Sequence, residues 1–316
     1  MKISLIITLK NEKETILELL MSILNQSKIP DELVIVDGGS IDNTVEIIRG
    51  FMKNTKITTR LIIKKSSNIA EGRNVAIKNA KYDLIAVTDG GVMLANDWLQ
   101  EITKPFNKVN EFEVVFGSFR VNGKSFIGKC YAEFCNYRRM KSNFSTTDLS
   151  SRSVAFKKNV WKKVGKYPEW LTLAGEDTLF FIKLKEKCKW TTSPNAIAYW
   201  NHTQETLLQI YERTYRNSVG CGEGNILSLR YIFLCCVYLI GIFIFILGLK
   251  FIILFLILAS LAIIRLMIGS FYVYKRLNFY KVFLIMPFIL LVRDLGMIFG
   301  YSNGFFNRVY NPKVKI

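Results

Sequence analysis

Histidine is almost absent from this chain of 316 residues, and its cysteines are few and scattered. There is one histidine, and none of the six cysteines forms a CxxC pair. A protein zinc site needs about four ligands at set spacings, mostly cysteine and histidine, so the sequence argues against one. Two of the cysteines lie inside an apolar run, which favours reduced, packing cysteines on the cytosolic side of a membrane.

Acidic residues are also scarce relative to basic ones. Asp and Glu number 25 against 43 Lys and Arg, a formal net charge of +18, while 50% of the residues are hydrophobic. No motif that reads RNA or DNA accompanies the charge, so the combination predicts a membrane partner and no nucleic acid. The apolar stretch after Met1-Lys2 is too short for a signal peptide. We therefore expect the soluble part to stay in the cytosol.

The first 200 residues alternate between apolar runs and segments with helical spacing. Strands are expected at 3–9, 33–36, 59–63 and 84–87, and helices at 14–24, 44–52 and 70–80. This alternation predicts an α/β fold with a doubly wound, mainly parallel sheet whose ligands gather at the carboxyl ends of its strands.

Acidic side chains end two of these strands. Asp37 and Asp89 should therefore meet at one edge, and paired carboxylates there commonly hold a ribose or a cation that bridges phosphates. For the stretch LVIVDGGSIDNT around Asp37, an ordinary capped strand–helix turn explains the pattern as well as a ligand site does. Arg73 and Asn74, at the start of a helix, would add phosphate or base contacts.

Two further signals have a structural explanation of their own. Glu176 and Asp177 begin an apolar helical stretch, where the helix dipole favours acidic residues without any function. The single histidine, His202, follows the strand-like AIAYW, and a lone histidine is more often structural than a ligand.

The composition changes at Tyr231. Residues 231–249 carry no charge, and residues 251–274 carry only Arg265. One helix across both runs would be about 65 Å long at about 1.5 Å per residue, twice a bilayer core of about 30 Å. The chain should therefore fold back near residues 248–250 and form two membrane helices.

A third apolar stretch, 282–292, is too short to span a bilayer before Arg293 and Asp294 interrupt it. It continues with glycines four apart, which form a close-packing face for helices in lipid. Basic residues follow the second membrane helix and recur in the tail at Arg308, Lys313 and Lys315. Counting them puts both ends of the hairpin in the cytosol and predicts an interfacial or third membrane helix at about 282–306.

Six segments occur in an order that resembles one family. They are SLIITLKNE, ILNQS, ELVIVDGGSIDNT, NIAEGRNVAIKNA, LIAVTDGG and GEDT. Over about residues 1–217 the chain is similar to the family 2 glycosyltransferases of the GT-A fold. The resemblance implies a GT-A catalytic domain at 1–202, amphipathic linker helices at 203–229 and a membrane region at 230–316.

The resemblance also implies roles for individual residues. Asp177, next to Glu176, would be the catalytic base, and Asp89 would match the first acid of the metal-binding DxD motif. His202 lies where some members supply a further metal ligand. Arg213 and Arg216 lie in the segment that approaches the diphosphate and the acceptor. The residues implied around the nucleotide are Thr8, Asn11, Glu12, Asp37, Asn68, Arg73, Asn74 and Asp89.

The chain departs from the family pattern at several points. Thr8 stands where proline is usual, and VDGGS replaces VDDGS. Asn217 replaces a tryptophan, which argues against a processive synthase of the cellulose or hyaluronan type. The segment Asp89-Gly90-Gly91 keeps only one acid of DxD, so His202 or Glu176 would have to compensate.

The function that the resemblance implies is an inverting, metal-dependent sugar transfer to a lipid-linked or surface-polysaccharide acceptor. The donor would be a nucleotide-sugar, with a UDP-sugar favoured, and Mg or Mn would neutralise the leaving diphosphate. The enzyme would be a multi-pass protein of the inner (cytoplasmic) membrane, in contact with lipids, with a cytosolic catalytic domain. Two alternatives stay open: a polyprenyl-phosphate glycosyltransferase, and a nucleotide-sugar-binding scaffold without catalysis.

Overall fold

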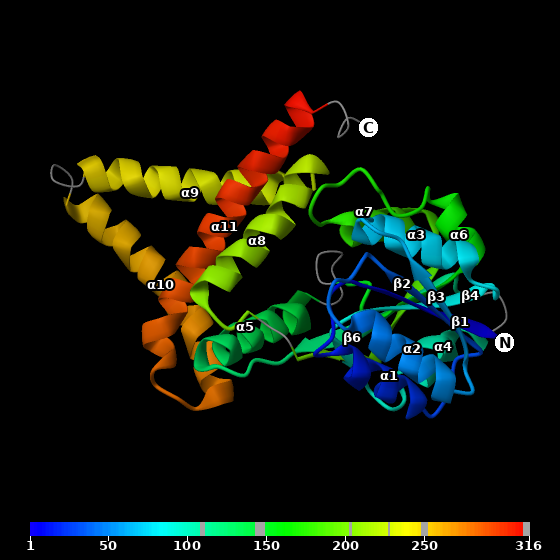
Figure 1. The fold of residues 1–316 in the computed structure, drawn as a ribbon. Coiled ribbons are helices and arrows are strands. Elements are labelled where there is room, and N and C mark those ends of the chain that lie inside the picture. Colours follow the sequence, from blue (N-terminus) through cyan, green and yellow to red (C-terminus); the bar gives the residue numbers. More distant parts are fainter. Residues whose placement is uncertain (108–110, 143–148, 202–203, 227, 248–251, 312–316) are drawn as a thin grey trace. The chain divides into compact units, whose positions relative to one another are not determined.

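The computed structural model describes residues 1–107, 111–142, 149–201, 204–226, 228–247 and 252–311 (Figure 1). The chain divides into two compact units that interleave along the sequence. The first unit contains Met1–Val121, Ser142–Glu169 and Glu176–His202, and the second contains Asn122–Lys141, Trp170–Gly175 and Thr203–Ile316. The predicted domains 1–202, 203–229 and 230–316 do not follow these units, because two short segments before residue 202 fall in the second unit.

The first unit is built on one eight-stranded sheet of order β3-β2-β1-β4-β7-β6-β8-β5. Its strands are β1 (Ile3–Leu9), β2 (Glu32–Asp37), β3 (Thr58–Ile63), β4 (Leu84–Asp89), β5 (Val92–Leu94), β6 (Val114–Val121), β7 (Val154–Lys157) and β8 (Trp190–Trp200). The neighbours β3, β2, β1 and β4 are parallel, as the alternating sequence predicts. The other half is mixed, since β7 runs antiparallel to both β4 and β6.

Helices cover both faces of this sheet, so the prediction of a doubly wound fold is confirmed (Figure 1). The helices are α1 (Ile16–Leu24), α2 (Thr44–Asn54), α3 (Ile69–Asn79), α4 (Trp98–Thr103), the 3₁₀ helix η1 (Lys104–Asn107), α6 (Lys158–Lys163) and α7 (Glu176–Lys187). Successive residues of β1 point to opposite faces. Leu5 and Ile7 pack with α1, α2 and α4, whereas Ile6 packs with α3, α6 and α7.

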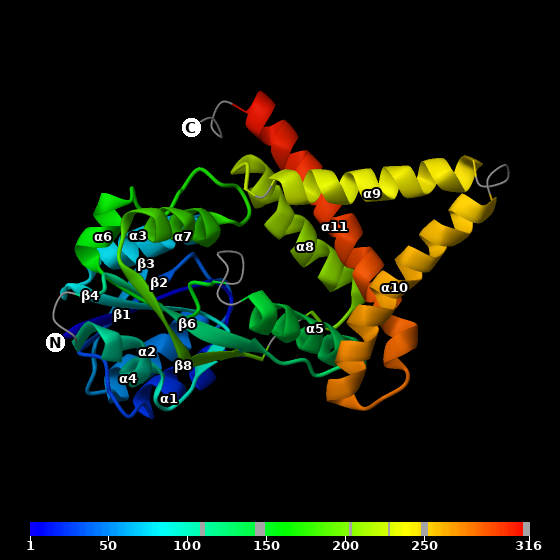
Figure 2. The same ribbon diagram turned by 180° about the vertical axis from the view of Figure 1, so that it is seen from behind.

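The second unit is helical. It contains α5 (Phe126–Ser142), α8 (Leu207–Glu223), α9 (Ser228–Leu247), α10 (Ile252–Leu277) and α11 (Val282–Tyr310). The helices α8 and α11 lie side by side in both ribbon views (Figures 1 and 2). The α11 glycines 296, 300 and 304 meet the carbonyl oxygens of Tyr211, Tyr215 and Val219 of α8. The predicted close-packing role of these glycines is therefore confirmed, because a side chain at any of them would collide with the α8 backbone.

The predicted helix at about 282–306 is present as α11, and the charged pair Arg293 and Asp294 does not break it. Arg293 Nη2 lies 2.6 Å from Asp294 Oδ1. The buried Asp294 also accepts a hydrogen bond of 3.1 Å from the Tyr238 hydroxyl of α9. Because the two charges are paired and hydrogen-bonded, the helix carries them without a break.

Within the described residues, α11 is the one helix whose length and composition would allow it to cross a bilayer. A shorter apolar helical segment covers Ser228–Phe243. The predicted fold-back near residues 248–250 lies outside the residues that the structure describes.

Candidate active site

Asp37 ends β2 and organises the loop that follows it. Its Oδ1 accepts hydrogen bonds from the backbone N–H groups of Gly39 (2.9 Å) and Ser40 (2.8 Å), and its Oδ2 accepts one from the Ser40 hydroxyl. Gly39 has φ +87°, a conformation that glycine adopts without strain. The carboxylate is fully buried, and its Oδ2, which accepts one hydrogen bond, keeps a lone pair for a second donor. Asp37 thus shapes this loop whatever else it binds.

Asn11 and Glu12 tie the loop after β1 to the loop after β2. Asn11, with φ +56°, donates its N–H to Ser40 Oγ at 2.8 Å, and its Oδ1 accepts from the N–H of Ile41 at 2.9 Å. The Glu12 side chain lies against the backbone of Gly90 and Gly91, where a methyl group added to either glycine would meet it at 3.0–3.3 Å. The two glycines that follow Asp89 are therefore needed for space beside Glu12.

Thr8 has a buried hydroxyl with no hydrogen-bond partner among the described residues. Its register places it between Val36 of β2 and Asp89 of β4. Its methyl group fills the space next to Gly72 of α3, 3.2 Å from where a β-carbon would stand. Since buried hydroxyls are normally hydrogen-bonded, this oxygen is a ready partner for a ligand at the sheet edge.

The amides of Asn68 and Asn74 are both used inside the protein. Asn68 caps α3 by accepting from the N–H of Glu71 (2.9 Å), and its amide nitrogen donates to the Glu169 carbonyl (2.7 Å). Asn74 donates to the carbonyl of Tyr167 and accepts from Trp161 Nε1, both at 2.8 Å. Their nucleotide-binding roles stay predictions, and the geometry gives each a structural role that the sequence did not reveal.

Arg73 joins two carboxylates from different elements. Its Nη2 lies 2.7 Å from Asp89 Oδ1 at the end of β4, and its Nη1 lies 2.5 Å from Glu176 Oε1 at the start of α7. The guanidinium is 1% exposed and lies 5.3 Å from the centre of the Tyr167 ring. Burial disfavours its charge, but Asp89 and then Glu176 raise the pKa of Arg73 above its ordinary value.

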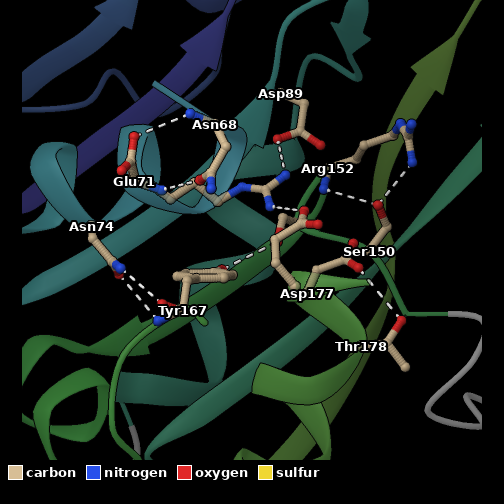
Figure 3. Close-up of polar contacts among 12 residues, drawn as sticks. Asn68, Glu71, Asn74, Asp89, Ser150, Arg152, Tyr167, Asp177 and Thr178 are labelled. Carbon is tan, nitrogen blue, oxygen red and sulfur yellow. Dashed lines mark hydrogen bonds and ion pairs between the residues drawn. The ribbon is translucent and has the colours of Figure 1, made fainter. Parts of the chain in front are cut away.

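Glu176 and Asp177 have different surroundings although they are adjacent. Burial and the neighbouring Asp177 raise the pKa of Glu176, while Arg73 lowers it. Asp177 is half-buried, and the hydrogen-bond donor closest to it among the described residues is the Thr178 hydroxyl at 3.5 Å, too long for a strong bond. Asp89 and Asp177 come to the same region from β4 and α7 (Figure 3). Asp177 is thus a carboxylate without an ion-pair partner among the described residues.

Arg152 is the site residue that the sequence analysis missed. It lies just before β7, and its carbonyl accepts a hydrogen bond of 2.9 Å from Thr88, next to Asp89. Its guanidinium lies 4.3 Å from the Trp200 ring centre and 5.2 Å from that of Phe119. Burial lowers the pKa of Arg152, and Asp89 and Asp177 oppose that shift. An arginine before a strand has no signature of its own unless the direction of that strand is known.

Three predicted residues lie outside the described part of the first unit. Arg213 and Arg216 lie on α8 of the second unit, with Arg213 half-buried and Arg216 exposed. His202 lies outside the described residues, so its predicted metal role stays a prediction.

The donor set for a divalent cation is small. No group of three or more His, Cys, Asp or Glu side chains suited to a metal occurs among the described residues, and all six cysteines are free. Asp89 Oδ1 is taken by Arg73, whereas Oδ2 accepts no hydrogen bond from a described residue. Mg²⁺ is commonly held by one or two carboxylates together with substrate phosphates. The residues therefore fit a cation held through one carboxylate oxygen and the phosphates of a ligand.

Comparison with known proteins assigns part of the chain to a family. Residues 4–157 match the glycosyl transferase family 2 model. The chain is 30% identical over 233 residues to poly-β-1,6-N-acetyl-D-glucosamine synthase of Staphylococcus epidermidis, a match that covers 70% of this chain and 55% of the synthase. The chain thus spans about half the length of that relative.

Two solved structures share the fold. The mannosyltransferase PcManGT from Pyrobaculum calidifontis, in complex with GDP-Man and Mn²⁺, matches with a TM-score of 0.59 at 16% identity and covers 98% of this chain and 88% of its own. TarS of S. aureus matches with a TM-score of 0.51 at 22% identity and covers 68% of this chain and 38% of its own. Residues 4–157 of the chain therefore form a glycosyl transferase family 2 domain, folded as part of a GT-A-type mixed α/β sheet.

Proposed function

We propose that this protein transfers a sugar, with inversion, from a nucleoside-diphosphate sugar to a lipid-linked or polysaccharide acceptor at the cytosolic face of a membrane. The observation that carries the proposal is the link that Arg73 makes between Asp89 and Glu176. It holds the acid that ends β4 beside the first turn of α7, where Asp177 presents a carboxylate that has no ion-pair partner in the described part of the chain. A donor-side acid and an unpaired base in one place are what a displacement at a sugar carbon requires.

The proposed reaction uses Asp177 as the general base. Its carboxylate takes the proton of an acceptor hydroxyl while that oxygen attacks the anomeric carbon, and the bond from this carbon to the diphosphate oxygen breaks. Attack opposite the leaving group inverts the anomeric configuration. Asp89 would hold a divalent cation, Mg or Mn, whose charge stabilises the leaving diphosphate when it is bound.

The loops after β1 and β2 supply the proposed nucleotide site. The Thr8 hydroxyl, which has no partner among the described residues, offers a hydrogen bond to the ligand, and the spare lone pair of Asp37 Oδ2 suits a ribose hydroxyl. Asn11 and Glu12 hold these loops together. A UDP-sugar is our first choice of donor, and GDP-mannose is the second because PcManGT is described in complex with it.

The acceptor and the location are inferred from the second unit. Exposed apolar residues cover much of α9, among them Leu229, Phe233, Leu239, Ile242 and Phe243. Apolar surfaces of this extent mark contact with lipid or another protein. With α10 as the second span, α9 would cross the inner membrane, and Arg213 and Arg216 of α8 would approach the diphosphate or the acceptor. The S. epidermidis relative is named as a polysaccharide synthase, which supports a glycan acceptor.

Release of nucleoside diphosphate tests the proposal. The purified full chain is incubated with UDP-N-acetylglucosamine, UDP-glucose or GDP-mannose, with Mg²⁺ or Mn²⁺, and with short glycans or polyprenyl-phosphate as acceptors. The proposal predicts acceptor-dependent release with one of these donors and inhibition by EDTA. Binding of a nucleotide-sugar without turnover under any of these conditions would instead favour the scaffold alternative.

A further inference from the structure

Arg152 is a cation whose charge no acidic group of the described chain neutralises by contact. Its Nη1 donates to the hydroxyl of Ser150 at 2.9 Å, and its Nε is buried without a hydrogen-bond partner among the described residues. No described carboxylate lies within ion-pair distance of it, in contrast to Arg73, which has two. A guanidinium that is half-buried and lacks such a partner is costly unless an anion binds there.

Two aromatic rings pack against this guanidinium and restrict its movement. The ring centre of Trp200, at the end of β8, is 4.3 Å away, and that of Phe119, on β6, is 5.2 Å away. The contact with Ser150 restricts it further. A guanidinium held in this way loses little freedom when its remaining N–H groups meet two oxygens of one anion.

The position of Arg152 indicates which anion that is. Because β7 runs antiparallel to β4, the residues before β7 lie at the carboxyl edge of the parallel strands, beside Thr88 and Asp89. Ligands of doubly wound sheets bind at this edge. Resting on the proposed function, we infer that Arg152 binds the diphosphate of the donor directly and supplies positive charge next to Asp89.

This role explains how a segment with a single acid, Asp89-Gly90-Gly91, is enough for binding of the donor diphosphate. The chain has a single acid where the family motif has two, and the positions of both glycines are crowded by Glu12. A fixed guanidinium contacts phosphate oxygens bidentately and needs no further carboxylate. Part of the affinity for the diphosphate then persists when divalent cations are removed.

Equilibrium binding of uridine and UDP in EDTA tests the inference, with guanosine and GDP measured in parallel. The measured quantity is the phosphate preference, the dissociation constant of the nucleoside divided by that of its diphosphate. Arg152→Gln should lower this preference about tenfold to a hundredfold, because a charge-assisted hydrogen bond is lost. Arg152→Lys, which keeps the charge, should retain part of it, and Arg49→Gln, at an exposed arginine of α2, should leave it unchanged.

Three other results would overturn the inference, and each would assign Arg152 a different role. Equal weakening of uridine and UDP would make Arg152 a structural residue, and unchanged binding of UDP would mean that it does not contact the phosphates. Weakening confined to UDP-glucuronic acid, compared with UDP-glucose, would assign it to a sugar carboxylate. If the wild-type chain bound neither UDP nor GDP even with Mg²⁺, the proposed function would fail together with it.

Discussion

One buried side chain, Arg73, pairs with two buried carboxylates of this site. Asp89 and Glu176 come from segments far apart in the sequence, and both would be buried carboxylates without it. Burying an unpaired ion costs several kcal/mol. The guanidinium between the two carboxylates is therefore needed to stabilise the folded site. The sequence predicts that Arg73 contacts the nucleotide, and the structure adds its contacts with the two acids.

Replacing Arg73 should destabilise the protein even without nucleotide. Arg73→Leu leaves two buried carboxylates uncompensated, which costs about 3–5 kcal/mol in the free energy of unfolding. The pKa of Glu176, already raised by burial and Asp177, rises further without Arg73, so the folded state then favours the protonated acid. The loss should therefore be larger at pH 8 than at pH 5.

Thermal unfolding of the full chain in detergent measures this loss, with Arg49→Leu as the exposed control. Equal, pH-independent losses for the two variants would show that the contacts of Arg73 with Asp89 and Glu176 contribute nothing.

At the scale of elements, the start of α3 holds Arg73 in place. Asn68 and Glu71 form a capping box there, in which each side chain bonds the backbone N–H of the other residue. By contrast, Asn43 at the N-cap of α2 makes no such bond. The chain thus offers two N-cap asparagines that differ in whether the side chain does the capping.

Asn68→Ala should therefore weaken the first turn of α3 by about 1 kcal/mol, a usual value for a lost N-cap. Asn43→Ala should change the first turn of α2 much less. Hydrogen exchange of the backbone amides reports both turns in the native protein. Similar acceleration in the two variants would mean that the cap bonds of Asn68 are not what stabilises the turn.

The packing of α8 against α11 depends on glycine. At Gly300 a methyl group would collide with the carbonyl oxygen of Tyr215, whereas at Gly241 on α9 it would meet nothing within 4 Å. Gly300→Ala should destabilise the helix pair by about 1–3 kcal/mol through overpacking. Gly241→Ala should be neutral or slightly stabilising, because alanine favours a helix.

Thermal unfolding of the two glycine variants in the same detergent compares them directly. A Gly300→Ala protein as stable as the Gly241→Ala protein would contradict the close approach of α8 and α11.

How far the sequence predicts this structure differs along the chain. The strands β1 to β4 are apolar runs between helical segments, so their existence and parallel order follow from local pattern. The strand β7 has four residues, and nothing in its sequence states that it runs antiparallel. That direction is what brings Arg152 to the sheet edge. Likewise, the partners of Asn74 lie about ninety positions away, and only the tertiary fold reveals them.

For the whole molecule, the proposed arrangement in a membrane would decide where the proposed acceptor is bound. The length and composition of α11 would allow a crossing. Against its glycines, however, packs α8, which carries the exposed side chains of Glu212 and Arg216. A charged helix at that depth in hydrocarbon would be costly, so we expect α11 to stay interfacial or re-entrant while α9 and α10 cross.

Cysteines introduced at Lys281 and Asn311, at the two ends of α11, test this topology on a cysteine-free background. Both should be shielded from an impermeant thiol reagent in intact cells, because both are expected in the cytosol. A cysteine at Lys250, between α9 and α10, should be labelled and serves as the positive control. Labelling at Asn311 together with shielding at Lys281 would establish that α11 crosses.

We propose that Asp177 accepts the proton of the acceptor hydroxyl in a sugar transfer, and the substitution Asp177→Asn is the sharpest test of this role. Once an active donor and acceptor are found, single-turnover rates and donor dissociation constants are measured for both proteins. The amide keeps the size of the side chain and removes the proton acceptor, so the rate should fall at least about a hundredfold while donor affinity changes little. An unchanged rate, or a loss of donor affinity equal to the loss of rate, would contradict the claim.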